Sequence, residues 1–454
     1  MTVSTQGLPM SSQQHAFSVR SKDIWAIALP ASLAFITEPV AGVVDTAVIG
    51  QLGDAGLLGG LALGAVAFSV IFALAFFLRF GTAGLVAQAV GARDPKDGLL
   101  HLARAMLVAV VLGVVLLALS VPVYWFFAAT LAPPAESQTA FTDYLFTRLW
   151  SVPFVFVNYV LLGWFYGRAA AKTGMALQML VNIVNIILSV VFVFGFGWSV
   201  VGVAAATVIG QVCASVGGIV LTIRHYGGLA NILAGTPRTE LLDLAAIRRM
   251  VGISRDLIIR SAALMGAFAY FAAQGARMGE IILASNAILL QLFAISAFFL
   301  DGLATATEQL CGRAVGANWR PAFERAMKLS FVWGTLIGGT LALVLLAFGW
   351  LAIDLMTTNA AVRETARVYL VMAALTPLTG MTAFIYDGIM IGATLNVTMR
   401  NGMLASLAIY LIAAIILQPL LGLWGLWLAL HILLLTRAGI YAVAIERRKG
   451  ELFA

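Results

Sequence analysis

Residues 57–90 read LLGGLALGAVAFSVIFALAFFLRFGTAGLVAQAV, and Arg79 is the single charged side chain in this run. An apolar stretch of about 18 residues or more is long enough to cross the roughly 30 Å hydrocarbon core of a bilayer as a helix. Runs of this kind recur along the whole chain. We predict twelve membrane-spanning helices, at residues 24–50, 57–90, 100–128, 142–167, 174–196, 199–224, 252–275, 281–312, 325–354, 365–392, 402–421 and 423–444. The predicted fold class is an all-α polytopic membrane protein.

Composition supports this assignment. Of the 454 residues 62% are hydrophobic and only 10% are charged, and the mean hydropathy is +1.00. A soluble domain has about a quarter of its residues charged. The net charge of +7 does not indicate a nucleic-acid partner, because the cations lie in short connections between apolar runs instead of in one patch. The surface is therefore predicted to face the lipid bilayer.

The distribution of cations predicts the orientation. Most of the 27 Lys and Arg fall in one alternate set of connections and in the two tails. Cytoplasmic loops carry such an excess of cations, so both termini are predicted to be cytoplasmic. The connections on the opposite side carry four cations, which are Arg148, Arg277, Arg363 and Arg367.

The two halves of the sequence repeat. Gln88–Arg93 (QAVGAR) recurs 225 residues later as Arg313–Asn318 (RAVGAN), and Gly167 matches Gly392 at the same offset. Six spans per half give both copies the same orientation, and substrate sites in such repeat proteins lie between the halves. The predicted organisation is a tail at 1–23, an N-terminal lobe at 24–224, a linker at 225–251 with an amphipathic surface segment, a C-terminal lobe at 252–444 and a tail at 445–454.

Signatures of catalysis are missing from the sequence. The four histidines are scattered without an HExxH pattern, no Walker A sequence is present, and Cys213 and Cys311 have no partner spacing. We therefore predict a transporter and not an enzyme, with no cofactor and no structural metal. Energy is expected from an ion gradient or from the gradient of the substrate.

Ionisable residues within the spans are the candidates for function. Each costs about 2.5–3.5 kcal/mol near a helix centre, so such residues face the protein interior. Arg79 is the one cation that we place in the interior, which is otherwise predicted to be acidic. The six residues are Glu38, Asp45, Arg79, Asp301, Glu308 and Asp387.

Asp45 and Glu38 are the candidates in the first span. They are seven residues apart and share one helix face, and Pro39 between them removes a backbone hydrogen bond and allows bending. Two carboxylates on one face suit a proton or a sodium ion. The structural alternative is an ion pair with Arg79.

The C-terminal half has three acids of its own. Asp301 and Glu308 repeat the seven-residue spacing, and Arg313 is close enough in sequence to pair with Glu308. Asp387 has no cation nearby in sequence, which favours a role in substrate binding or coupling. In the fifth span, Asn182, Asn185 and Ser189 are uncharged polar residues that could form hydrogen bonds beside Asp45, or act as interhelical contacts.

Four segments resemble the multidrug and toxic compound extrusion (MATE) family, and in particular its DinF (DNA-damage-inducible protein F) branch. They are TEPVAGVVDTAVIGQLG at 37–53, FLRFGTAGLVAQAVGAR at 77–93, DGLATATE at 301–308 and YDGIMIGAT at 386–394. The resemblance runs from about residue 24 to residue 445. It implies twelve helices in two pseudo-symmetric six-helix lobes around a central cleft, and export by alternating access driven by entry of protons or sodium ions.

By position, the resemblance makes Asp45 the cation-coupling aspartate, with Asn185 as its assistant and Asp387 as a second functional acid. Ser189 departs from the family, since many relatives have an aspartate there. The expected function is a proton- or sodium-coupled antiporter that exports small organic, cationic or amphipathic compounds. An exporter of organic acids such as citrate and a lipid-linked oligosaccharide flippase remain alternatives. We expect a monomer in a bacterial inner membrane.

Overall fold

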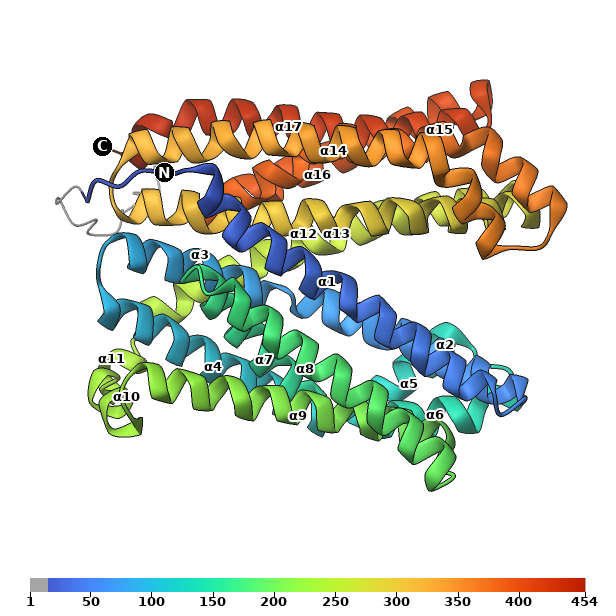
Figure 1. Cartoon of the computed structure of the whole chain (residues 1–454), viewed down its shortest axis with the longest axis horizontal. Coiled ribbons are helices and arrows are strands. Elements are labelled where there is room, and N and C mark those ends of the chain that lie inside the picture. The colour runs from blue at the N-terminus through green and yellow to red at the C-terminus, as the bar shows by residue number, and fades with distance from the viewer. Residues whose placement is uncertain (1–14, 454) are drawn as a thin grey trace. The chain divides into compact units, whose positions relative to one another are not determined.

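The structure is a computed structural model that describes residues 15–453, and over this range the chain is helical with short connections (Figure 1). Most of the predicted N-terminal tail lies outside the described residues. The helices are α1 Ser21–Gly50, α2 Ala55–Ala75, α3 Phe77–Gly91, α4 Pro95–Ala118, α5 Ser120–Leu131, α6 Ala135–Leu149, α7 Val152–Gly167, α8 Ala171–Val190, the π-helical turn η1 Val191–Gly195, α9 Ser199–His225, α10 Leu229–Gly235, α11 Arg238–Leu241, α12 Leu244–Arg277, α13 Glu280–Gly316, α14 Arg320–Met356, α15 Ala360–Gly392, α16 Asn396–Leu421 and α17 Leu423–Leu452.

The number of predicted membrane spans is confirmed. Eleven helical segments of the described chain are long and apolar enough to cross a membrane, and the bent pair α6–α7 makes a twelfth. Asp54 begins α2 as expected for a tight turn, since its side chain accepts hydrogen bonds from Gly56 N at 2.8 Å and Leu57 N at 3.2 Å.

Two spans predicted to be continuous are broken at prolines. Pro122 has no N–H to donate to the carbonyl of Ala118, where α4 ends. Pro153 likewise leaves the carbonyl of Leu149 without its helical donor, and α6 and α7 meet at an angle of 51°. Hydropathy identified both spans and could not show where they bend.

The predicted linker at residues 225–251 contains two short helices, α10 and α11, followed by the first turns of α12. Lys96 of α4 pairs with Glu240 of α11 at 2.7 Å, and Arg104 Nη2 donates to the carbonyl of Glu240 at 2.7 Å. These contacts attach α11 to α4.

The chain divides into two compact units. The N-terminal unit comprises residues 33–86 and 96–254, and the C-terminal unit comprises the described residues up to 32, residues 87–95 and the chain from 255 onward. The first turns of α1 and the end of α3 therefore belong with the C-terminal unit, a distribution that the lobe boundaries from sequence did not anticipate.

The duplication is also present in the helix packing. In the N-terminal unit, Gly163 and Gly167 of α7 face backbone carbonyls of α3 so closely that a Cβ atom would collide with them. Gly388 and Gly392 of α15, 225 residues later, face carbonyls of α13 in the same way. The four carbonyls belong to Arg79, Ala83, Ala304 and Glu308. Each unit thus has a matching helix pair in close backbone contact because glycine has no side chain.

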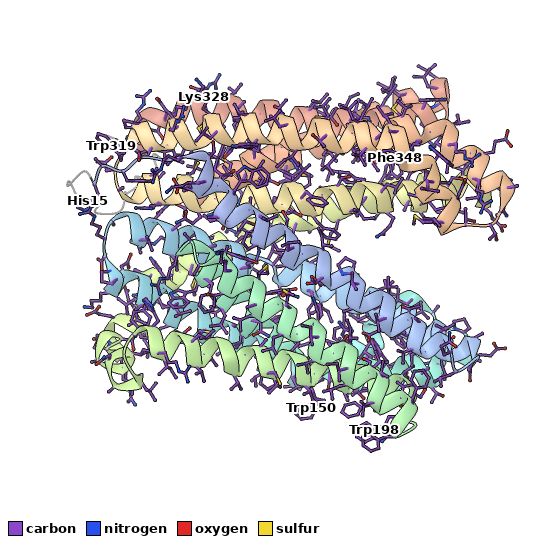
Figure 2. The ribbon with its side chains drawn as sticks, viewed as in Figure 1. His15, Trp150, Trp198, Trp319, Lys328 and Phe348 are labelled. Carbon is purple, nitrogen blue, oxygen red and sulfur yellow. The ribbon has the colours of Figure 1, made fainter. Side chains whose placement is uncertain are left out.

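Two tryptophans lie on the outer surface of the N-terminal unit. Trp150 at the α6–α7 bend and Trp198 before α9 both project outward in Figure 2, and their exposed fractions are 62% and 48%. Tryptophan is enriched where a membrane protein meets the lipid headgroups. Trp198, which lies in a connection between two spans, therefore suits a membrane–water interface.

Candidate functional site

Asp45 is the centre of a buried polar cluster in the N-terminal unit. It lies on α1 and is only 7% exposed. Ser189 Oγ donates a hydrogen bond to Asp45 Oδ1 at 2.8 Å, and Asn185 Nδ2 lies 3.5 Å from Asp45 Oδ2. Ser189 and Asn185 share one face of α8 because they are four residues apart. The structure therefore brings together three residues that the sequence singled out separately.

Thr207 of α9 completes the cluster, and the sequence reasoning missed it. Asn185 Nδ2 donates to Thr207 Oγ1 at 2.9 Å, and the Thr207 hydroxyl donates to the Val203 carbonyl at 3.1 Å. The other amide atom, Asn185 Oδ1, is buried and has no hydrogen-bond partner among the residues that the structure describes. A buried acceptor without a donor is uncommon in folded proteins, and a bound water or ion is one of its ordinary explanations.

A cavity of about 260 Å³ opens beside this cluster. Glu38, whose side chain is exposed, lines the cavity together with Asp45, so the predicted shared face of α1 is present in the structure. Asn182 also lines it and donates to Thr37 Oγ1 at 2.7 Å. The remaining polar lining consists of Thr46, Ser69, Tyr144, Arg148, Asn158, Tyr159, Gln178, Asn185, Thr207 and Gln211.

Arg148 is the cation of this cavity. Its position near the start of a predicted span had placed it among the outer connections. In the structure its guanidinium lines the cavity, donates to the Tyr144 hydroxyl and lies over the rings of Phe68 and Phe72. Its distance from the start of the span at 142, nearly two helical turns, was the signal that could have identified it.

Arg79 lies among aromatic rings in the N-terminal unit. Its guanidinium lies 4.4 Å from the ring centroid of Phe80, 5.2 Å from that of Phe35 and 5.5 Å from that of Tyr166. Cation–π contacts of this kind stabilise a buried cation without a carboxylate. The proposal that Arg79 forms a structural ion pair stays a prediction, and Arg148 takes its expected place beside Asp45.

The C-terminal unit contains a buried ion-pair cluster around Asp387. Arg260 of α12 pairs with Asp387 Oδ2, and Arg437 of α17 lies 3.6 Å from the same oxygen. Arg260 is 9% exposed and Arg437 is 2% exposed. The prediction that Arg79 is the only interior cation is therefore wrong, as is the prediction of a purely acidic interior.

The sequence analysis missed these two interior arginines because it assigned each cation to one side of the membrane and left its depth in the span out of account. Arg260 lies eight residues after the start of a predicted span, and Arg437 lies seven residues before the end of another, yet both were counted with the cytoplasmic cations. Depth within a span was the available signal. The lack of a cation near Asp387 in sequence was uninformative, because Arg260 is 127 residues away along the chain.

Asp301 and Glu308 both lie on α13 in the C-terminal unit. Asp301 interacts electrostatically with Arg260, which connects it to the Asp387 cluster. Glu308 is buried where α13 packs against Gly388 and Gly392 of α15. The structure therefore places these two acids near different partners, and their roles in substrate binding or coupling stay predictions.

These observations define a class of protein. Twelve apolar spans in two duplicated units, with ionisable residues held inside them, are the architecture of a secondary transporter. The MatE family model matches the chain in both repeats, at residues 30–191 and 257–420. The chain belongs to the MatE family, that of the multidrug and toxic compound extrusion transporters.

Relatives cover nearly the whole chain. It is 34% identical to DNA damage-inducible protein F of Escherichia coli (strain K12) over 438 residues, which is 94% of this chain and 92% of that protein. It is 24% identical over 446 residues to the protein DETOXIFICATION 44, chloroplastic, of Arabidopsis thaliana, covering 94% of this chain and 82% of the relative. The resemblance to the DinF branch is confirmed by the first of these.

Solved structures show the same fold. A MATE crystal structure in the straight conformation superposes with a TM-score of 0.85 at 19% identity, covering 95% of this chain and 96% of that one. A MATE structure in the bent conformation superposes with a TM-score of 0.84 at 18% identity, covering 96% and 99%. The fold is that of the MATE transporters, as the sequence predicted.

Proposed function

We propose that this MATE-family transporter is an antiporter, in which a proton or a sodium ion binds at Asp45 and drives export of small organic compounds. It acts as a monomer in a bacterial inner membrane with both termini in the cytoplasm. The orientation is supported by the distribution of Lys and Arg between the connections. Protein DETOXIFICATION 44 and the multidrug export protein MepA of Staphylococcus aureus are among the relatives, and their names support efflux as the activity.

The bonding of Asp45 carries the proposal. It is buried within a membrane span, and among the described residues its hydrogen-bond donors are neutral and no cation forms an ion pair with it. A buried carboxylate without a cationic partner is costly unless it takes up a proton or a metal ion. Asp45 is therefore poised to bind the coupling cation.

The surrounding oxygen atoms suit either ion. Ser189 Oγ contacts the carboxylate, and Thr207 Oγ1 and Asn185 Oδ1 belong to the same hydrogen-bonded cluster, so the cluster offers oxygen atoms of the kind that a hard cation binds. Where the family resemblance implied a second aspartate, this chain has Ser189, which is neutral. We propose that Asp45 carries the coupling charge in this unit and that Glu38 is the second carboxylate of the cavity.

Asp387 has the opposite bonding. Arg260 and Arg437 already compensate its charge, so an added cation would have to compete with two guanidinium groups. This makes Asp45, and not Asp387, the proposed coupling residue. Antiport then follows from competition between the substrate and the coupling cation, because they use the same cavity and cannot both bind there well.

Efflux from proteoliposomes tests the proposal. A fluorescent lipophilic cation is loaded, and a proton gradient or a sodium gradient is imposed separately on wild type, on Asp45→Asn and on Asp143→Asn. Asp143 is an exposed aspartate of the same unit and serves as the matched control. We expect efflux driven by one gradient, its loss in Asp45→Asn and its retention in Asp143→Asn.

Two outcomes would count against the proposal. Full gradient-driven export by Asp45→Asn would remove Asp45 from the coupling step. Transport that neither gradient drives would favour the alternatives, an exporter of organic acids or a flippase for lipid-linked oligosaccharides. A flippase needs a strongly cationic cavity for pyrophosphate, whereas this cavity has one arginine and two acids.

A further inference from the structure

The cavity of the N-terminal unit holds charges of both signs. Glu38 and Asp45 line it from α1, and Arg148 lines it from α6. Arg148 acts electrostatically on both carboxylates, yet among the described residues it forms an ion pair with neither. Opposite charges therefore face one open volume of about 260 Å³ without neutralising each other directly.

The guanidinium of Arg148 is held in place and has donor capacity left. Its Nη1 donates to the Tyr144 hydroxyl, and its Cζ lies 5.1 Å from the ring centroid of Phe68, 5.9 Å from that of Phe72 and 5.5 Å from that of Tyr144. Its Nε is buried and has no hydrogen-bond partner within residues 15–453. A guanidinium has five N–H donors in a rigid fork that matches a carboxylate, so this group is ready to bind one.

A ligand with a single kind of charge satisfies only one side of this lining. A simple cation would be attracted by the two acids and repelled by Arg148, and a simple anion would meet the reverse. A molecule with both charges satisfies both sides. Its apolar body would contact Leu61, Phe68, Phe72, Val155, Leu162 and Val181, which line the same cavity.

We propose that the cavity binds organic zwitterions, small apolar molecules that carry one carboxylate and one amine. The carboxylate binds Arg148, and the ammonium binds the Glu38 side of the acidic pair. This inference rests on the proposed function and names its substrate class. It also gives the exchange a physical cause, because the ammonium competes with the coupling cation for the two neighbouring carboxylates.

A matched set of three ligands tests the proposal by equilibrium binding to the full-length protein in detergent, without any gradient. Tryptamine carries the amine, indole-3-propionate carries the carboxylate, and tryptophan carries both on the same ring system. We expect tryptophan to bind wild type about tenfold or more tightly than either of the others, because each charged hydrogen bond is worth at least that factor.

Variants of Arg148 test whether the carboxylate of the ligand binds at this residue. In Arg148→Gln the preference for tryptophan over tryptamine should fall about tenfold or more, and Arg148→Lys should retain part of it since the charge remains. Arg367→Gln, an arginine that pairs with Asp354 in the C-terminal unit, is the control and should keep the wild-type preference. An Arg148→Gln protein that fails to fold leaves the wild-type series and Arg148→Lys to decide.

The outcomes separate this inference from the proposed function. Equal binding of tryptamine and tryptophan to wild type, no binding of any of the three ligands, or an equal loss for all three in Arg148→Gln would overturn the zwitterion site. Tryptophan could bind through Arg148 while neither the proton gradient nor the sodium gradient drives efflux. That result would support the zwitterion site and reject the coupled antiport.

Discussion

The Ser189 hydroxyl donates its hydrogen bond to the carboxylate of Asp45, with Oγ 2.8 Å from Oδ1, across 144 residues of sequence. Ser189 is fully buried and Asp45 nearly so. A hydroxyl therefore occupies the position where the family resemblance implied a second acid. The bond orients the Asp45 carboxylate and leaves its charge for the coupling cation that we propose.

Removal of this hydroxyl should weaken export. A hydrogen bond to a charged group contributes about 1.5–3 kcal/mol, so Ser189→Ala should lower export at a fixed gradient by about tenfold or more. The measurement is the initial rate of dye efflux from proteoliposomes. Ser215→Ala is the control, because Ser215 is a buried serine of the same unit that bonds Asn158 at 3.0 Å and not Asp45. Equal rates for the two variants would contradict the assigned role of Ser189.

Thr207 is expected to stabilise the protein through the hydrogen bonds of its hydroxyl and not through the volume of its side chain. Thr207→Val keeps the volume and removes the acceptor of the 2.9 Å bond from Asn185, leaving a buried amide N–H unsatisfied. The expected cost in the free energy of unfolding is about 1–3 kcal/mol, measured by denaturant titration in detergent. Thr222→Val serves for comparison, since that hydroxyl bonds only the Gly218 carbonyl of its own helix at 2.8 Å. An equally small loss in the free energy of unfolding for Thr207→Val and Thr222→Val would contradict the role of Thr207 in the Asp45 cluster.

The Asp387 cluster should show strong coupling between its members. Asp387→Asn leaves Arg260 and Arg437 buried without their shared carboxylate, and loss of one partner of a buried pair costs about 3–5 kcal/mol. Adding Arg260→Met to Asp387→Asn should recover part of this loss, because one uncompensated guanidinium is removed. A double-mutant cycle on the free energy of unfolding measures the interaction. Additive effects of the two changes would show that the residues do not act together.

The duplicated glycine contacts should be equally intolerant of a side chain. Gly163→Ala and Gly388→Ala each place a Cβ against a backbone carbonyl that cannot turn away, so each should destabilise its unit by about 1–3 kcal/mol. At Gly339 of α14 an added Cβ would meet no atom within 4 Å, and Gly339→Ala should be neutral or stabilising by about 0.5–1 kcal/mol. Thermal unfolding in detergent compares all three. A stable Gly388→Ala protein would show that α13 and α15 can separate without cost.

Much of the fold was predictable because hydropathy is a local property. A run of apolar residues identifies each span, and short motifs such as Gln88–Arg93 and Arg313–Asn318 identify the repeat. The bends at Pro122 and Pro153 were harder to predict from the sequence. A proline in a membrane span can be accommodated or can break the helix, and the neighbouring helices decide between these outcomes.

The sequence by itself determined the membrane-spanning character, the number of spans and the family. It also singled out Asp45 and Glu38 as candidates, because the cost of burying a charge depends mainly on its depth in the span. Only the tertiary structure decided which polar groups meet. It placed Thr207 and Arg148 at the Asp45 cavity and placed Arg260 and Arg437 at Asp387. The rotation of each helix about its axis selects these partners, and that rotation is set by packing between segments distant in sequence, such as the 127 residues between Arg260 and Asp387.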